Sequence, residues 1–331
     1  MNKKVVTFGE LLLRLSPFGY KRIVQAESFE AIYAGAEANV AVSLAVMGVP
    51  SAVVSKVPAH EIGQCAVNTL RKWGVDTSNI ARGGDRLGIY FIEKGASQRA
   101  SKVVYDRANS SIATALASDF NWKEIFADAS IFHFSGITPA LSDSLAAITL
   151  EAVKAAKELG VTVSCDVNYR SKLWSREKAQ KVMAQYMPYI DICIANDEEV
   201  TDVFGIPLEG ADINKIAADL AEKYGFKAIA IDHLDSVSSN ENYWQAMYYT
   251  NGQVYNSSRY HTVVIDRVGL GDAFGAGLLY GIYNEFDPQK TIECAIAAST
   301  LKYSIEGDSN IVTADEVLAL VAGAASGGVQ R

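Results

Sequence analysis

The sequence predicts an α/β protein built on a mainly parallel sheet, and three observations lead to this class. Short apolar segments alternate along the chain with segments whose apolar residues have helical spacing. The short segments are continuous apolar runs, which fits strands that are buried on both faces. Two segments in the first third of the chain break the alternation and predict a separate small sheet. Such alternation is typical of a parallel sheet that helices cover on both sides.

The expected elements follow one another in a regular order. The first strand covers residues 5–8, VVTF, and ends at Gly9. Further strands are expected at 51–57, 130–136, 161–168, 189–196 and 227–232. Helices are expected between them, at 36–48, 63–74, 142–160, 176–187 and 211–224. The first of these helices stops at Gly48, in keeping with the frequency of glycine at helix ends.

Two strand-like segments, 11–34 and 86–107, have no helices between their runs; the second contains LGIYFIEKG and ASKVVYDRA. We interpret both segments as a small β-sheet beside the main sheet. In open α/β sheets the ligand site lies beyond the carboxyl ends of the strands. A lid over that edge would exclude water from a reaction.

The composition narrows the class of protein. The 331 residues, 49% hydrophobic and 21% charged, are enough for one large domain with a smaller attachment or for two domains. The net charge of −8 and the lack of a basic block argue against nucleic acid as a partner. No apolar stretch reaches 18 residues, so we expect a cytoplasmic protein without a membrane partner. Four cysteines stand far apart among apolar residues, which predicts buried free thiols: Cys65, Cys165, Cys193 and Cys294.

The stretch VIDRVGLGDAFGAG, residues 264–277, combines a strand end, a glycine turn and a carboxylate where a helix begins. The turn departs from the dinucleotide fingerprint, because Phe274 stands where the last glycine should be, and the Walker pattern is absent. Unpaired backbone N–H groups and the helix dipole make such a turn an anion site. Asp272 is then either an N-cap or the acid that takes a hydroxyl proton during phosphoryl transfer.

This stretch, together with AGAEANVAVSLAVMG at 34–48 and NDEE at 196–199, resembles the phosphofructokinase B or ribokinase-like sugar kinases. The resemblance covers nearly the whole chain. Within that family, similarity to the 2-keto-3-deoxygluconate kinases is carried by GELLLRLSP, SKVP, YDRANSS, FHFSGITPALS, DVNYRSKLWS and EGDSN. The resemblance implies a ribokinase-like three-layer α/β/α fold and one kinase domain over residues 1–331, with the lid segments inserted in it. It also implies ATP and Mg²⁺ as cofactors.

Roles follow from the resemblance residue by residue. It implies that Asp272 is the general base and that the preceding turn, Gly269, Leu270 and Gly271, supplies an anion hole. Leu270 departs from the family, where Ala or Gly is common at this position. Its N–H group can still donate, but we expect its side chain to add bulk beside the phosphates.

Two further pairs match family motifs. Gly35 and Asn39 match the substrate side, since glycine lets a sugar approach the backbone and an amide can both donate and accept. The alternative for this pair is a turn and a helix N-terminus. Asn196 and Glu199 match N-x-x-E, which implies that they organise phosphates and Mg²⁺, with Glu199 acting on the metal through water. The alternative for this second pair is an Asn cap followed by solvated acids.

Four residues match positions that contact the keto acid in 2-keto-3-deoxygluconate kinases: Tyr90, Tyr105, Arg107 and Arg170. Arg107 lies two residues after Tyr105, so on a strand both side chains would share a face. Arg170 follows a strand, in the loop at its carboxyl end. The two guanidinium groups could therefore grip a carboxylate from opposite walls of a cleft. Alternatively, the tyrosines face outward and the arginines pair with neighbours such as Asp106 or Asp166.

Residues 232–250, DHLDSVSSNENYWQAMYYT, depart from the family as well. Many members have a glycine-containing turn there that borders the nucleotide, whereas this run is longer, polar and without glycine. The residues that contact the adenine base of ATP are therefore not assigned from the sequence. The resemblance also implies a monovalent-cation site near Asp266, which this sequence permits, and a homo-oligomer that forms through the lid.

The function predicted from these residues is ATP-dependent phosphorylation of 2-keto-3-deoxygluconate to the 6-phospho product. A kinase of a neutral sugar, such as fructose or ribose, is the alternative within the class, but a neutral sugar has no use for both Arg107 and Arg170. A weakly active sugar-acid binding protein on a kinase scaffold is an alternative from another class. Asp272, Asn196 and Glu199 argue against a binding protein, whereas Leu270 leaves it open. The stereochemistry of the acid is open too.

Overall fold

The main sheet of the protein is mostly parallel, as the sequence predicts. The structure is a computed structural model that describes residues 3–207 and 212–324. The strands of the main sheet run in the order β13-β12-β11-β10-β9-β8-β1-β4-β5, and β14 pairs with β12. Their bounds are β1 Lys4–Phe8, β4 Ser51–Val57, β5 Ile80–Arg82, β8 Ala129–Ser135, β9 Thr162–Asp166, β10 Ile192–Asn196, β11 Ala228–Ser238, β12 Glu241–Thr250, β13 Gln253–Asn256 and β14 Tyr260–Val263.

All six predicted strands of the main sheet are present, and the pairs from β5 through β11 are parallel. The sequence interpretation missed β5, β12, β13 and β14. It also ended the strand from residue 227 at 232, whereas β11 continues to Ser238 and pairs antiparallel with β12. The polar run 232–250 is therefore a long hairpin at one edge of the sheet.

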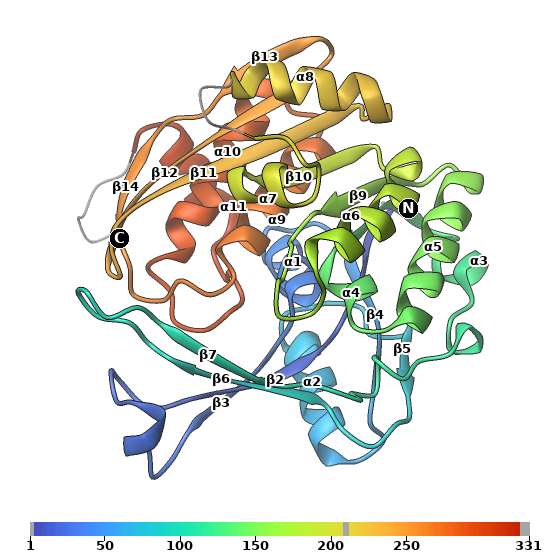
Figure 1. Cartoon of the computed structure of the whole chain (residues 1–331), viewed down its shortest axis with the longest axis vertical. Helices are drawn as coiled ribbons and strands as arrows, with labels where there is room; N and C mark the ends of the chain where they lie inside the picture. The colour runs from blue at the N-terminus through green and yellow to red at the C-terminus, as the bar shows by residue number, and fades with distance from the viewer. Residues whose placement is uncertain (1–2, 208–211, 325–331) are drawn as a thin grey trace.

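Helices cover both faces of the main sheet, so the fold has three layers (Figure 1). One face packs against α3 (Trp122–Ile125), α5 (Asp143–Glu158), α6 (Arg176–Tyr186) and α8 (Ile213–Tyr224). The other face packs against α1 (Ala36–Val46), α2 (Glu61–Lys72), α9 (Leu270–Tyr283), α10 (Pro288–Lys302) and α11 (Ala314–Val321). Two short helices, α4 (Ile137–Ala140) and α7 (Asp197–Asp202), follow the carboxyl ends of β8 and β10. The predicted helix 211–224 corresponds to α8; residue 211 itself lies outside the described residues.

The long helix α5 illustrates why these segments fold as they do. The Ser142 hydroxyl accepts a bond from the Leu145 N–H at 3.1 Å and so caps the helix. Leu145, Ile148 and Ala152 recur at helical spacing and are buried against the sheet. The expectation of buried thiols is confirmed for three of the four cysteines and is wrong for Cys65, which lies on the exposed side of α2.

A second, smaller sheet lies beside the main sheet and confirms the predicted lid strands (Figure 1). Its strands run in the order β3-β2-β6-β7, with bounds β2 Leu12–Ser16, β3 Glu30–Ala34, β6 Gly88–Glu93 and β7 Lys102–Asp106. These strands fall within the predicted segments 11–34 and 86–107. No helix in the described parts of the chain is long and apolar enough to cross a membrane. The division of the chain into a single domain over 1–331 stays a prediction.

Candidate active site

A cavity of about 260 Å³ lies between the small sheet and the carboxyl ends of the main strands. We call it the lid cavity. Ten of its lining residues are residues that the sequence singles out: Gly35, Asn39, Tyr90, Tyr105, Arg107, Arg170, Gly269, Leu270, Gly271 and Asp272. They come from segments far apart in the chain, so the fold brings the predicted substrate residues and the predicted base into one place.

The turn Gly269–Gly271, which we call the anion turn, leads directly into α9. Gly269 has a φ of 81°, and a Cβ there would stand 1.9 Å from the carbonyl oxygen of Asp308. Only glycine fits such a position. Gly271 is exposed, and a Cβ there would meet nothing within 4 Å. Because the first N–H groups of a helix have no intrahelical partner, the start of α9 offers free donors to an anion in the cavity.

Leu270, the middle residue of the anion turn, is largely buried. The residue is 7% exposed and belongs to the hydrophobic core under α9 and α10. Its carbonyl accepts a bond from the buried Ser299 hydroxyl at 2.9 Å. Because Leu270 also lines the lid cavity, the expectation of side-chain bulk beside the phosphates stays a prediction.

Asp272 is the third residue of α9, not its first, and the N-cap position belongs to Gly269. Its carboxylate accepts a bond from Asn39 Nδ2 at 2.7 Å. The N-cap alternative is therefore wrong. Burial raises the pKa of Asp272 to about 7, and the negative charges of Asp166 and Glu37 act in the same direction, against the bond from Asn39. A carboxylate with a pKa near neutrality suits a general base.

Asn39 and Gly35 begin α1, opposite α9. The Asn39 amide donates to Asp272, and its oxygen accepts a bond from Ser309 Oγ at 3.2 Å. Asn39 thus orients the carboxylate of Asp272, and Ser309 in turn orients the amide of Asn39. Gly35 has a packing reason to be glycine, since a Cβ there would stand 2.0 Å from the carbonyl oxygen of Glu10. Contact of either residue with a sugar stays a prediction.

Arg107 is nearly buried and pairs with Glu10, a residue that the sequence interpretation missed. Arg107 Nε donates to Glu10 Oε2 at 2.8 Å, and Nη2 contacts the same oxygen. Pairing of Arg107 with Asp106 is wrong, because Asp106 binds Arg86 at 2.9 Å. Glu10 follows the first buried strand, at the edge of the sheet where ligand sites form. This position was the one feature of the sequence that could have identified Glu10 as a site residue.

Tyr90 and Tyr105 are partners across β6 and β7, with ring centroids 6.0 Å apart. Arg107 lies 5.3 Å from the centroid of the Tyr105 ring, as expected for two side chains on one face. Tyr90 is 6% exposed, and its hydroxyl donates to the carboxylate of Asp308. Both rings line the cavity, so the outward-facing alternative is wrong for Tyr90, whereas Tyr105 remains 39% exposed.

A second cavity, of about 440 Å³, adjoins the lid cavity. We call it the acid cavity, because its lining includes Asp166, Asp197, Glu198, Glu199 and Asp232. Asn168, Arg170 and Gly271 line both cavities. Arg170 is exposed, and its Nη1 donates to the carbonyl of Tyr169 at 3.0 Å. Arg170 therefore stands at the junction, with most of its donors available to a ligand in either cavity.

Asn196 and Glu199 form a capping box at the start of α7. Asn196 Oδ1 accepts from the Glu199 N–H at 3.0 Å, and Glu199 Oε2 accepts from the Asn196 N–H at 3.1 Å. The other oxygen of Glu199 accepts from the Tyr169 N–H at 2.8 Å. Asn196 is thus a helix cap, but Glu199 is 5% exposed, so the alternative of a solvated acid is wrong for it.

The acids of this cavity concentrate negative charge. Burial first, and the neighbouring Asp166 next, raise the pKa of Glu199 to about 8 and that of Asp232 to about 8. Burial raises the pKa of Asp166 to about 6. A divalent cation would relieve this repulsion. No three acid, His or Cys side chains of the described residues are grouped to hold a metal directly.

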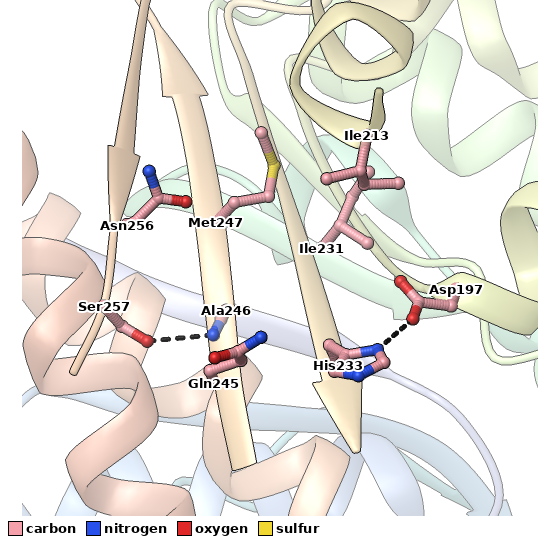
Figure 2. A pocket seen from close by; sticks show the side chains of 9 residues that line it. All are labelled: Asp197, Ile213, Ile231, His233, Gln245, Ala246, Met247, Asn256 and Ser257. Carbon is pink, nitrogen blue, oxygen red and sulfur yellow. Dashed lines mark hydrogen bonds and ion pairs between the residues drawn. The ribbon is translucent and has the colours of Figure 1, made fainter. Parts of the chain in front are cut away.

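A third cavity, of about 450 Å³, lies over β11, β12 and β13 (Figure 2). Ile231 and Met247 point into it from neighbouring strands, and Asp197 and His233 join it to the acid cavity. The run 232–250 thus lines two cavities. Its turn also reaches the lid: the Ser239 N–H donates to the carbonyl of Ser97 at 3.0 Å.

Comparison with known proteins agrees with this geometry. Residues 2–314 match the model of the pfkB family carbohydrate kinase. A 2-dehydro-3-deoxygalactonokinase of Haloferax volcanii is 34% identical over 99% of both chains. A solved 2-dehydro-3-deoxygluconokinase of Thermotoga maritima is 51% identical, with a TM-score of 0.96 over 98% of this chain and 99% of the other. A ribokinase II of E. coli, solved with ATP and Mg²⁺, shares the fold at 21% identity and a TM-score of 0.84 over 97% and 99%. The chain therefore belongs to the PfkB family of carbohydrate kinases, as its motifs predict.

Proposed function

We propose that the protein transfers the γ-phosphoryl group of ATP to the 6-hydroxyl of 2-keto-3-deoxygluconate. One observation carries this proposal: two arginines line the same cavity as Asp272 and the anion turn. The relatives named for 2-dehydro-3-deoxy sugar acids support it. These names differ only in the configuration of the sugar acid, so the galacto epimer is the natural second substrate to test.

The arginines give the carboxylate of the substrate a place to bind. Glu10 uses the Nε and Nη2 groups of Arg107, and Nη1 has no bond to any of the described residues. Glu10 therefore fixes the guanidinium plane and leaves one edge for the substrate. Arg170 supplies a second cation from the opposite wall. A neutral sugar would leave both groups without a charged partner.

Asp272 takes the proton of the acceptor hydroxyl in the proposed step. Asn39 holds its carboxylate, and its raised pKa matches a base that works near neutral pH. The N–H groups of the anion turn stabilise the charge on the transferred phosphoryl group. The acid cavity, through Asn196 and Glu199, holds the phosphates together with Mg²⁺, which neutralises charge on them when bound.

Two parts of the proposal lie outside the site. A homo-oligomer that forms through the lid is proposed because the lid segments leave apolar side chains at the surface: Val104 on β7 is 43% exposed, and Tyr20, after β2, is 53% exposed. A monovalent cation near Asp266 is also proposed; it would share this carboxylate with Arg14, which binds it at 2.8 Å.

The experiment is an ADP-release assay over a panel of acceptors: 2-keto-3-deoxygluconate, its galacto epimer, fructose and ribose. We expect Arg107→Ala to lower kcat/KM for the acid by about 10- to 150-fold, the value of one hydrogen bond to a charged group. Arg170→Ala should lower it at least as much and also slow turnover, since Arg170 reaches the acid cavity. Arg259→Ala, an exposed arginine paired with Asp235 outside both cavities, is the control. Preference of the wild type for fructose or ribose would replace this proposal with the neutral-sugar kinase.

A further inference from the structure

A fully buried arginine of the small sheet, Arg14 on β2, bridges two carboxylates that border the anion turn. Its side chain is 1% exposed. Nη2 donates to Asp266 Oδ2 at 2.8 Å, and Nη1 donates to Asp308 Oδ1 at 2.6 Å. Nε donates to Ser16 Oγ at 2.7 Å. One guanidinium thus ties the segment before the anion turn to the loop after α10.

Each of the two acids is in contact with the turn or its flank. Asp266 Oδ1 accepts a bond from the Val268 N–H at 3.1 Å, one residue before Gly269. Asp266 Oδ2 also accepts from the Gly307 N–H at 3.1 Å, beside Asp308. The carbonyl of Asp308 lies directly against Gly269, where it leaves no room for a Cβ. The position of the anion turn therefore depends on the two loops that Arg14 joins.

The same network reaches the small sheet. Arg14 stands opposite Tyr90 in the register of β2 and β6. The Tyr90 hydroxyl donates to the other oxygen of Asp308, and both Tyr90 and Asp308 line the lid cavity. The position of the lid strands and the position of the anion turn thus depend on one shared carboxylate.

The charges make Arg14 hard to replace. The side chains of Asp266 and Asp308 are 2% and 4% exposed, so water does little to screen them. Another buried cation, Lys302, donates its Nζ to the carbonyl of Ile305 at 2.9 Å; it interacts electrostatically with Asp266 and Asp308 but makes no direct ion pair with either among the described residues. Without Arg14 the two acids would lose the one cation that binds both directly, and the guanidinium that joins the two loops would be gone.

We infer that Arg14 is a positioning residue for phosphoryl transfer, which holds the N–H groups of the anion turn in place and couples them to the lid. The inference rests on the proposed function, in which this turn receives the phosphoryl charge. A displacement of about 1 Å at such a site costs about 100-fold in rate. We therefore expect Arg14→Ala to lower kcat by about 100-fold, with smaller changes in KM for ATP and for the sugar acid.

The test is chemical rescue. Guanidinium at millimolar concentration should enter the space left in Arg14→Ala and raise its kcat at least about tenfold, because the lost group is a guanidinium cation. It should not rescue Asp272→Asn. Lys157→Met is a control at a distance from the site, since Lys157 pairs with a nearly buried acid, Asp191, at the opposite end of β10, and Asp191 keeps a second partner in Lys227. That variant should lose stability and keep its kcat while folded.

Arg14→Lys provides the second reading if Arg14→Ala does not fold. Lysine keeps the positive charge but cannot bind both carboxylates as the guanidinium does. The variant should therefore lower kcat more than it changes the KM for ATP or for the sugar acid. A folded Arg14→Ala enzyme with wild-type kcat, a kcat loss that guanidinium does not reverse, or a wild-type kcat in Arg14→Lys would each overturn the inference. If the wild type phosphorylates a neutral sugar instead, the same variants are assayed on that sugar, so the substrate assignment and the role of Arg14 fail separately.

Discussion

Removing the Asn39 amide should move the pH dependence of the reaction. Asn39 Nδ2 donates to the Asp272 carboxylate at 2.7 Å and opposes the rise that burial causes in the pKa of Asp272, which is about 7. A hydrogen bond to a charged group is worth about 1.5–3 kcal/mol. Since one pKa unit corresponds to about 1.36 kcal/mol, Asn39→Ala should raise the pKa of Asp272 by about one to two units.

The direction of the effect follows from the role of the base. Asp272 works as the ionised carboxylate, so activity falls as the pH drops below its pKa. At pH 7 the ionised fraction should fall from about one half to between about a tenth and a hundredth. The value of kcat/KM at pH 7 should then fall about 5- to 50-fold and recover toward pH 9. An ADP-release assay of kcat/KM for the sugar acid between pH 5.5 and about 9.5 measures this acidic limb.

Ser309→Ala is the matched control for this prediction. It removes the bond to the Asn39 oxygen and leaves the bond from Asn39 to Asp272 in place. Its acidic limb should stay close to that of the wild type. If Asn39→Ala instead loses activity equally at every pH, Asn39 acts only on the sugar, and the argument for a tuned base is refuted.

Three further substitutions test the anion turn and its acid. Asp272→Asn should lower turnover by about 10²- to 10⁴-fold while sugar binding, measured by calorimetry, is largely kept; turnover within a few-fold of the wild type would remove Asp272 from the base role. Gly269→Ala should inactivate the folded enzyme, because its methyl group would meet the carbonyl of Asp308 and the backbone has a positive φ; an active variant would show that the turn tolerates displacement. Leu270→Ala should cost about 2–5 kcal/mol of unfolding free energy in a denaturant titration, as buried leucines do, yet stay active. A stable but inactive Leu270→Ala would place the side chain in the site after all.

The sequence predicted those parts of the protein that local patterns determine. Continuous apolar runs located the parallel strands, and the motif around Asp272 located the turn before α9. The four residues proposed for the keto acid do line one cavity. The pairing of Arg107 with Glu10 and of Tyr90 with Asp308 could not be predicted, because the partners lie far apart in the chain and no local pattern joins them.

The edge of the sheet shows the other limit of sequence analysis. Residues 232–250 carry no glycine where many family members have a glycine-containing turn, so the resemblance did not predict the hairpin that forms there. The strand that pairs with β10 up to Asp232 continues as β11 to Ser238 and pairs with β12, which in turn pairs with β13 and β14. Ser239 and Asn240 form the turn, and β12 is rich in tyrosine, so backbone pairing and strand propensity act together in this segment.

The central claim is that the lid cavity recognises a carboxylate. It is tested most directly by comparing two acceptors that differ only at C1, 2-keto-3-deoxygluconate and the sugar in which the carboxylate is reduced to an alcohol. We expect kcat/KM to be at least about 10- to 150-fold higher for the acid, the value of one hydrogen bond to a charged group. In Arg107→Ala this preference should decrease, with Arg170 keeping the remainder. Equal kcat/KM for the two acceptors in the wild type would contradict the claim and would assign the cavity to a neutral sugar.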